Sequence, residues 1–138
     1  MMSFSNQKIK IELEDFSQKL NEFDLYPLKP TKIKVFQVNI GKMCNQTCRH
    51  CHVDAGPDRK EIMSQDTMQM CVDLIKKYRF PTVDITGGAP EMNPHFRWFV
   101  EELSQIGTHI VDRCNLTIIL ANQKFHDLPQ FFKKNQVE

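Results

Sequence analysis

The chain has 138 residues, enough for one domain with a substantial hydrophobic core. Its 18 Lys and Arg residues nearly balance 17 Asp and Glu residues, and the net charge of +1 gives no electrostatic reason to expect nucleic acid or an anionic membrane as a partner. No stretch has the apolar core of a signal peptide or the length of a membrane span, which predicts a cytoplasmic location. In that reducing compartment, the five cysteines suit metal binding or burial better than disulfides.

The first segment, residues 11–23, is predicted to be an amphipathic helix packed on the outside of the domain. Its apolar residues recur every three or four positions and therefore share one helix face. These residues are Leu13, Phe16, Leu20 and Phe23. Two prolines within residues 25–30 interrupt regular structure and predict a connector. We therefore divide the chain into a helix with its connector, residues 1–30, and a domain over residues 31–138.

Three strand–helix units are predicted after the connector. Runs rich in β-branched and aromatic residues indicate strands, and apolar residues at helical spacing indicate the helices between them. The strands are expected at residues 33–40, 82–86 and 109–113, and the helices at 65–78, 94–106 and 128–135. Ser64, Asn93 and Asp127 are the expected N-caps of these helices, and Gly107 is expected to end the second helix.

Strands that alternate with helices imply parallel pairing and right-handed crossovers, so the predicted fold class is α/β. In the first strand, alternate side chains share a face, and one face becomes polar toward the end of the strand. The two sets are Phe36, Val38 and Ile40, and Val35, Gln37 and Asn39. Unusual residues follow each strand: a cysteine-rich loop, then residues 87–88, then residues 113–115. Parallel α/β folds bind ligands at the carboxyl ends of their strands, so these loops predict one shared site.

The cysteine-rich loop, residues 43–57, carries the strongest functional signal. Cys44, Cys48 and Cys51 are spaced Cys-x3-Cys-x2-Cys, and soft thiolates at this spacing can converge on one metal centre. Basic side chains in the same region favour the thiolate form. Zinc sites and cubane iron–sulfur clusters take four ligands, and no fourth cysteine lies nearby. Either a histidine completes the set, or one metal position stays open for chemistry.

Four interpretations of this motif follow from the residues alone. Three buried cysteines without a metal are disfavoured by the close spacing. A zinc site could use His50 or His52 as its fourth ligand. Residues 48–52 also match the Cys-x-x-Cys-His signature of covalent haem, which belongs to an exported compartment. The fourth interpretation is a 4Fe–4S cluster on three cysteines, with one iron free to bind a small molecule.

The three-cysteine motif resembles the cluster motif of the radical S-adenosylmethionine (SAM) enzymes. Three stretches in the same order also resemble one subgroup, the arsenosugar-biosynthesis radical SAM proteins. These stretches are CNQTCRHCHVDAGP at residues 44–57, TGGAPEMNP at 86–94 and RCNLTI at 113–118. The resemblance implies that Cys44, Cys48 and Cys51 hold a 4Fe–4S cluster whose fourth iron binds SAM. It further implies cleavage of SAM to a 5′-deoxyadenosyl radical, a methylated arsenic compound as the small-molecule substrate, and an electron donor for the cluster.

The resemblance also implies a contact to the amino group of SAM. Gly87 and Gly88 match the glycines of the Gly-Gly-Glu stretch that holds this ammonium group in the family. Ala89 occupies the glutamate position, so a carboxylate is missing there. Either backbone carbonyls suffice, or Glu91 supplies the carboxylate. The structural alternative for the glycine pair is a plain turn between a strand and a helix.

Two further residues are expected near SAM by the same resemblance. His50 stands where many family members place an aromatic residue near the adenine, and Asn115 stands where related enzymes contact the ribose. A turn-forming asparagine is the alternative for Asn115. Cys71, on the apolar face of a helix, and Cys114 are predicted to be structural thiols outside the cluster.

A complete radical SAM barrel has more strand–helix units than the three predicted here. The resemblance therefore implies a partial (βα) parallel barrel, the N-terminal half of a truncated domain, with a missing C-terminal half or a partner chain supplying the rest. Residues 115–120 either extend the third strand or begin the next connection, and Val137 is expected to begin a fourth strand. The third strand would keep an unpaired edge, and Val35 and Val83 or their face-mates would be exposed. We expect no turnover by this chain alone; the alternative function is a non-catalytic module that binds zinc or an electron-carrying cluster.

Overall fold

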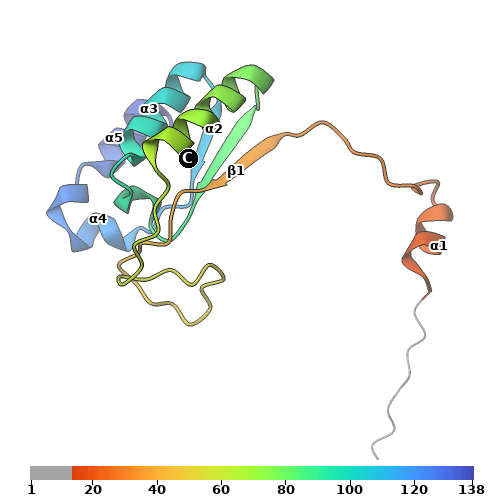
Figure 1. The fold of residues 1–138 in the computed structure, drawn as a ribbon, viewed down its shortest axis with the longest axis horizontal. Helices are drawn as coiled ribbons and strands as arrows, with labels where there is room; N and C mark the ends of the chain where they lie inside the picture. The colour runs from red at the N-terminus through yellow and green to blue at the C-terminus, as the bar shows by residue number, and fades with distance from the viewer. Residues whose placement is uncertain (1–13) are drawn as a thin grey trace, which may run out of the picture. The chain divides into compact units, whose positions relative to one another are not determined.

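The structure, a computed structural model, describes residues 14–138 of the chain (Figure 1). The chain divides into two compact units, Met1–Lys32 and Ile33–Glu138. The described part of the first unit contains helix α1, Phe16–Asn21, which starts at the N-cap Asp15 and buries none of its residues. A helix was predicted here and is confirmed, although it is shorter than expected. The predicted start of the helix, at residues 11–13, lies outside the described residues.

The second unit consists of three strands that alternate with helices, as the sequence predicts. Its elements are β1 Val35–Asn39, α2 Gln65–Tyr78, β2 Thr82–Thr86, the 3-10 helix η1 Pro90–Met92, α3 Phe96–Ile106, β3 His109–Asp112, α4 Thr117–Ala121, the 3-10 helix η2 Gln123–Phe125 and α5 Leu128–Asn135. Residues 115–120 thus begin a helical connection and do not extend β3.

The three strands form one parallel sheet in the order β1-β2-β3, which confirms the predicted α/β fold with parallel pairing. In its register, Val83 lies between Phe36 and Ile110. The predicted fourth strand takes the form of a single parallel bridge between Val137 and Ile110. The Glu138 N–H donates to the Ile110 carbonyl at 2.9 Å, so the last residues cover part of the edge of β3.

Helices α2, α3 and α5 lie on one face of the sheet (Figure 1). Val38 and Ile40 point into this layer and are buried, whereas Val35 on the opposite face is 49 % exposed. The structure thus confirms the predicted division of β1 into two faces, with Val38 and Ile40 on one face and Val35 on the other. The expected exposure of Val83 is wrong: it is 0 % exposed, because its register beside Phe36 places it on the helical face.

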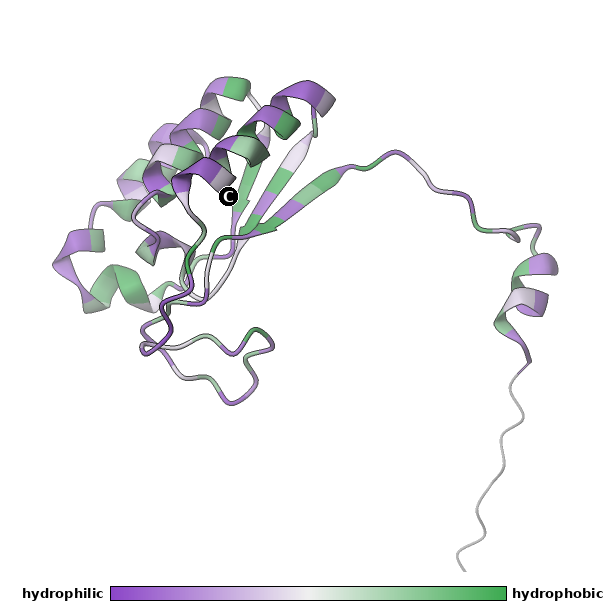
Figure 2. Cartoon of the chain, in the orientation of Figure 1, coloured by the Kyte–Doolittle hydropathy of each residue, from purple (hydrophilic) through white to green (hydrophobic). Residues whose placement is uncertain are grey.

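The helices that cover the sheet are amphipathic, with polar and apolar residues alternating along each ribbon (Figure 2). Their apolar sides and the sheet form one hydrophobic core. The largest fully buried side chains are Phe96, Phe99, Ile40, Met68, Ile75 and Ile85. Cys71 packs against this core but is only half-buried, so it is less enclosed than its helical position suggested.

The predicted caps are confirmed in part. The Ser64 hydroxyl accepts a hydrogen bond from the Thr67 N–H and starts α2, and Gly107 ends α3 in a left-handed conformation. Asp127 stands at the N-cap of α5, but its side chain caps nothing. The Arg97 guanidinium binds its two carboxylate oxygens at 2.7 and 2.9 Å, so an ion pair between α3 and the start of α5 replaces the cap.

Asn93 joins three segments and does not cap α3, which begins at Phe96. Its Oδ1 accepts a hydrogen bond from the His95 N–H at 2.8 Å. Its Nδ2 donates to the carbonyls of Ile40 and Met63, at 2.9 and 3.1 Å. The buried amide therefore fixes the end of β1 and the approach to α2 against the start of α3.

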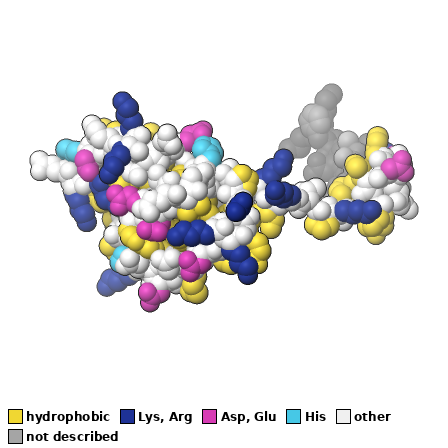
Figure 3. All heavy atoms as spheres, turned by 90° about the horizontal axis from the view of Figure 1, so that it is seen from above, with side chains coloured by type: hydrophobic (Ala, Val, Ile, Leu, Met, Phe, Trp, Pro, Cys, Tyr) yellow, Lys and Arg dark blue, Asp and Glu magenta, His cyan; other side chains and the backbone are white. Residues whose placement is uncertain are grey.

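None of the described helices is both long and apolar enough to cross a membrane. Basic and acidic side chains are intermixed over the face of the described residues that Figure 3 shows. This mixed surface agrees with the near balance of charges in the sequence.

We predict that Asn93→Ala lowers the free energy of unfolding by at least about 2 kcal/mol, because the buried amide makes three hydrogen bonds. The Met63 carbonyl and the His95 N–H lose their partner, and the Ile40 carbonyl keeps only the Met63 N–H. Urea denaturation followed by circular dichroism measures this change. Gln105→Ala, which removes an exposed amide from α3, is the matched control and should change stability by less than about 0.5 kcal/mol. Equal losses in the two variants would contradict the role assigned to Asn93.

Candidate functional site

The cysteine loop leaves the carboxyl end of β1 and is closed at its base by backbone pairing (Figure 1). Met43 forms a parallel bridge with Gly56, and Gly41 forms an antiparallel bridge with Ile62. The Cys44 N–H donates to the Gly56 carbonyl at 3.1 Å. The loop is therefore anchored on the same stem at both ends, although it contains no helix or strand of its own.

The glycine pair after β2 packs directly on this stem. The Gly88 N–H donates to the Gly41 carbonyl at 3.0 Å, and the Ala89 N–H donates to the Met43 carbonyl at 2.8 Å. A Cβ atom on Gly88 would lie 2.4 Å from the Met43 carbonyl oxygen, closer than any side chain can stand. Glycine at this position therefore allows the loops after β1 and β2 to touch.

The three motif cysteines have different surroundings. Cys44 is buried, Cys48 is exposed and Cys51 is half-buried. Cys48 and Cys51 line the same cavity of about 250 Å³, together with Asp54 and Arg59. Arg59 donates to Asp54 at 2.9 Å and also to Glu61, so its charge is paired with two carboxylates at this cavity.

Backbone N–H groups lower the pKa of the Cys51 thiol below its ordinary value. The largest cause is the Ala55 N–H, which lies 3.3 Å from the Cys51 sulfur, followed by the Val53 N–H. The sequence indicated basic side chains as the source of thiolate stabilisation, whereas at Cys51 the main source is the turn that follows it. The turn thus favours the thiolate form of Cys51.

Within residues 14–138, the motif cysteines and the exposed His50 and His52 do not gather three ligand atoms within 4.8 Å of one another. This arrangement differs from a zinc site, in which every ligand must reach a single ion. A four-iron cluster is larger, and each cysteine binds a different iron atom, so its ligands stand further apart. The assignment of the three cysteines to a four-iron cluster therefore stays a prediction.

The loop after β3 reaches the cysteine loop through Asn115. Its Nδ2 donates to the Asn45 Oδ1 at 2.6 Å and to the Cys44 sulfur at 3.4 Å. Its Oδ1 accepts from the Thr117 hydroxyl at 2.8 Å. The sequence placed Asn115 near the site, but this contact with a motif cysteine depends on two segments 71 residues apart and carried no sequence signal.

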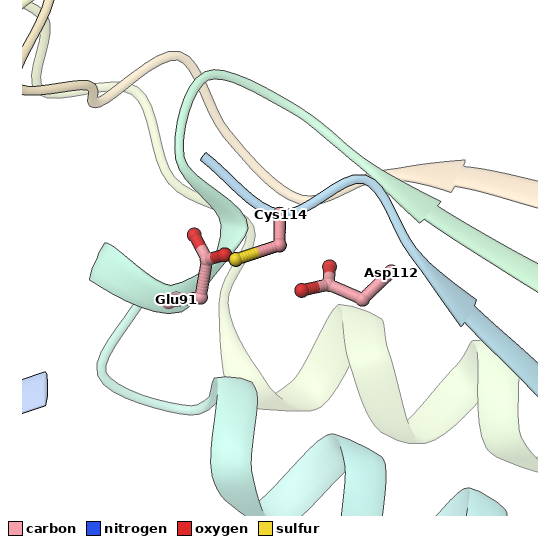
Figure 4. Close-up of side chains that lie close together, drawn as sticks. All are labelled: Glu91, Asp112 and Cys114. Carbon is pink, nitrogen blue, oxygen red and sulfur yellow. The ribbon is translucent and has the colours of Figure 1, made fainter. Parts of the chain in front are cut away.

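Glu91, the candidate replacement for the missing carboxylate at Ala89, points into the protein. It is 5 % exposed and lies in η1, and Figure 4 shows its carboxylate directed toward Cys114 and Asp112. Burial is the main reason that the pKa of Glu91 is raised. The pKa of the Cys114 thiol is also raised, first by burial, so Cys114 lacks the thiolate character of a reactive cysteine.

A polar network lies on the sheet face opposite the helices. The Arg113 Nε and Nη2 donate to the Asp84 carboxylate at 2.9 and 2.8 Å, and the Gln37 amide donates to it at 2.7 Å. The hydrogen bonds from Arg113 are the largest cause of the lowered pKa of Asp84. The polar face predicted from β1 therefore continues across β2 and β3 toward the same end of the sheet.

Comparison with known proteins gives distant curated relatives of this chain. No protein-family model matches the chain. Similar curated relatives include a "Probable GTP 3′,8-cyclase" of Sulfolobus acidocaldarius, 22% identical over 76 residues that cover 55% of this chain and 24% of the relative. A protein of the same name from Sulfurisphaera tokodaii is 21% identical over 89 residues, which cover 64% of this chain and 28% of the relative.

The chain thus spans about a quarter of the length of these curated relatives. The similarity supports the radical SAM superfamily as the class of this chain. The finer resemblance to arsenosugar-biosynthesis proteins remains a prediction, because neither relative carries that name.

We predict that Gly88→Ala destabilises the chain by about 1–3 kcal/mol, as overpacking in a closed contact does. The added methyl group would also meet the Lys42 carbonyl and the Ala55 Cβ, both at 2.9 Å. Thermal or urea unfolding measures the loss. Gly56→Ala is the matched control, since the nearest atom to its new Cβ would be the Thr47 Cγ2 at 3.8 Å. If Gly88→Ala were as stable as the control, the contact between the two loops would not be tight.

Proposed function

We propose that this chain forms part of a radical SAM enzyme in which Cys44, Cys48 and Cys51 hold a 4Fe–4S cluster that binds SAM. One observation carries the proposal: the loops after all three parallel strands meet, and their junction includes a motif cysteine. Gly88 ties the second loop to the first, and Asn115 ties the third loop to Cys44. Ligand sites of parallel α/β folds form at this end of the sheet.

When bound, the cluster and SAM supply a 5′-deoxyadenosyl radical. The chain itself would hold the cluster with three thiolates and bind the ammonium group of SAM with backbone carbonyls. In the described part of the chain, the carbonyls of Gly87 and Gly88 accept no hydrogen bond, so both are available to a cationic group. Glu91 is turned toward Asp112 and Cys114, and the carbonyls therefore take this role without it.

His50 is exposed in the cysteine loop, where its ring can stack on an adenine. Asn115 is less free to contact a ribose. Both of its N–H groups donate, to Asn45 and Cys44, and its oxygen accepts from Thr117. A ribose contact would require one of these partners to be exchanged. We therefore assign to Asn115 the positioning of Cys44 first, and contact with SAM second.

The substrate and partner assignments rest on the resemblance. We propose a methylated arsenic compound as the substrate, bound over the sheet face that carries Gln37, Asp84 and Arg113. Cys48 is exposed, and a cluster held there would be open to an electron donor from this side. The edge of β3 beyond its single bridge to Val137 offers pairing for a further strand that would enclose this face.

Reconstitution with iron and sulfide under anaerobic conditions tests the proposal. We expect about four irons and four sulfides per chain, as a cubane cluster requires, and a reduced-state paramagnetic spectrum that SAM changes. Serine at Cys44, Cys48 or Cys51 should abolish stable cluster binding, and Cys71→Ser is the matched control that should keep the iron. Stoichiometric zinc in place of iron, or loss of iron from the control, would overturn the assignment.

We predict that Asn115→Ala makes the midpoint potential of the cluster more negative. Hydrogen bonds to a cluster sulfur stabilise the reduced state, and this variant removes the donor at Cys44. A redox titration followed by electron paramagnetic resonance measures the shift. Asn45→Ala is the control, because it leaves the Asn115 amide free to reach Cys44. Equal shifts in the two variants would show that the hydrogen bond to sulfur is not the cause.

A further inference from the structure

Three side chains that could bind a metal lie close together near the carboxyl end of β3, and none of them belongs to the cysteine motif. Glu91 comes from η1, Asp112 from the last position of β3, and Cys114 from the loop that follows (Figure 4). One oxygen of each carboxylate and the Cys114 sulfur lie within 4.8 Å of one another. Within residues 14–138, no other group of three His, Cys, Asp or Glu side chains is so closely gathered.

The two carboxylates in this group are buried without partners. Glu91 is 5 % exposed and Asp112 is 9 % exposed. All four of their oxygens lack a hydrogen bond within the described part of the chain. Unpaired buried carboxylates are costly, so a proton or a cation must neutralise them. Burial and the neighbouring Glu91 raise the pKa of Asp112 to about 8, which reflects this missing counter-charge.

The nearest guanidinium does not provide that charge. Arg113 follows Asp112 directly, and successive side chains point to opposite faces of a sheet. Arg113 accordingly binds Asp84 on the open face, while Asp112 points toward the helices. The group of Glu91, Asp112 and Cys114 therefore contains two acids and a thiol, and no basic side chain of the described residues binds the two carboxylates.

We propose that Glu91, Asp112 and Cys114 form a zinc-binding site. The donor set selects the metal, because magnesium and calcium take oxygen ligands, whereas zinc accepts carboxylate oxygen and cysteine sulfur together. Zinc bonds to such ligands are about 2.0–2.3 Å long, so the three ligand atoms would surround one ion. Three protein ligands leave the fourth tetrahedral position to water or another small ligand.

A cavity adjoins two of the three residues. Asp112 and Cys114 line a cavity of about 660 Å³ that also includes Ile119, Phe132 and Val137. An ion bound here would join η1 to the end of β3. These two segments lead from the glycine pair and into Asn115, so the ion would brace the loops of the proposed SAM site. The proposal does not depend on the iron–sulfur cluster.

The test uses the full chain with Cys44, Cys48 and Cys51 replaced by serine, which removes the competing thiols. Calorimetry should show one bound Zn²⁺ per chain. Co²⁺ should give the intense visible bands of a tetrahedral site and a near-ultraviolet charge-transfer band from thiolate. Cys114→Ser should abolish the charge-transfer band, and Glu91→Gln or Asp112→Asn should weaken zinc binding at least tenfold. Cys71→Ser is the matched control and should leave the affinity and the spectrum unchanged.

A second measurement covers variants that fold poorly. In the parent chain with all its cysteines, Cys114→Ser should lower the zinc stoichiometry by one, and added zinc should raise the melting temperature of the serine-substituted chain only while Cys114 is present. Absence of zinc binding in the folded serine-substituted chain would overturn the proposal. So would a cobalt spectrum without a thiolate band, because cobalt would then be bound without Cys114.

Discussion

The backbone contact between Gly88 and the stem of the cysteine loop is the constraint on which the site depends. Gly88 lies where a side chain would collide with the carbonyl oxygens of Met43 and Lys42. Two hydrogen bonds, from Gly88 and Ala89 to the stem, hold the same contact. The cysteine loop has no regular structure of its own, so its position relative to the sheet comes from this junction and from Asn93 at the end of β1.

Acidic residues on the two faces of the sheet have different surroundings. On the open face, Asp84 meets Arg113 and Gln37, and its pKa is lowered. On the helical face, Asp112 is enclosed without a basic partner, and its pKa is raised. Both acids sit near the carboxyl ends of neighbouring strands. The difference arises because alternation turns Arg113 toward one face and Asp112 toward the other.

These features describe a site assembled from three loops with separate tasks. The first loop carries the cysteines, the second provides free backbone carbonyls, and the third directs an amide at Cys44. None of the three is positioned by its own sequence, since each depends on contacts with another. The chain spans about a quarter of the length of the curated relatives that it matches.

The sequence by itself determined the features that depend on local spacing. Alternation within β1, the helical period of α2 and α3, the Ser64 cap and the spacing of the three cysteines are all set by neighbours a few residues apart. The parallel sheet followed from the order of these elements.

Tertiary structure decided every feature that depends on a distant partner. Strand register placed Val83 on the helical face of the sheet. The ion pair with Arg97 holds the Asp127 side chain, which therefore does not cap α5. The same holds for the hydrogen bond from Asn115 to Cys44, and for the group of Glu91, Asp112 and Cys114. These contacts join segments with no common period, and no local pattern specifies them. They exist because packing the helices on the sheet brings the ends of its strands together.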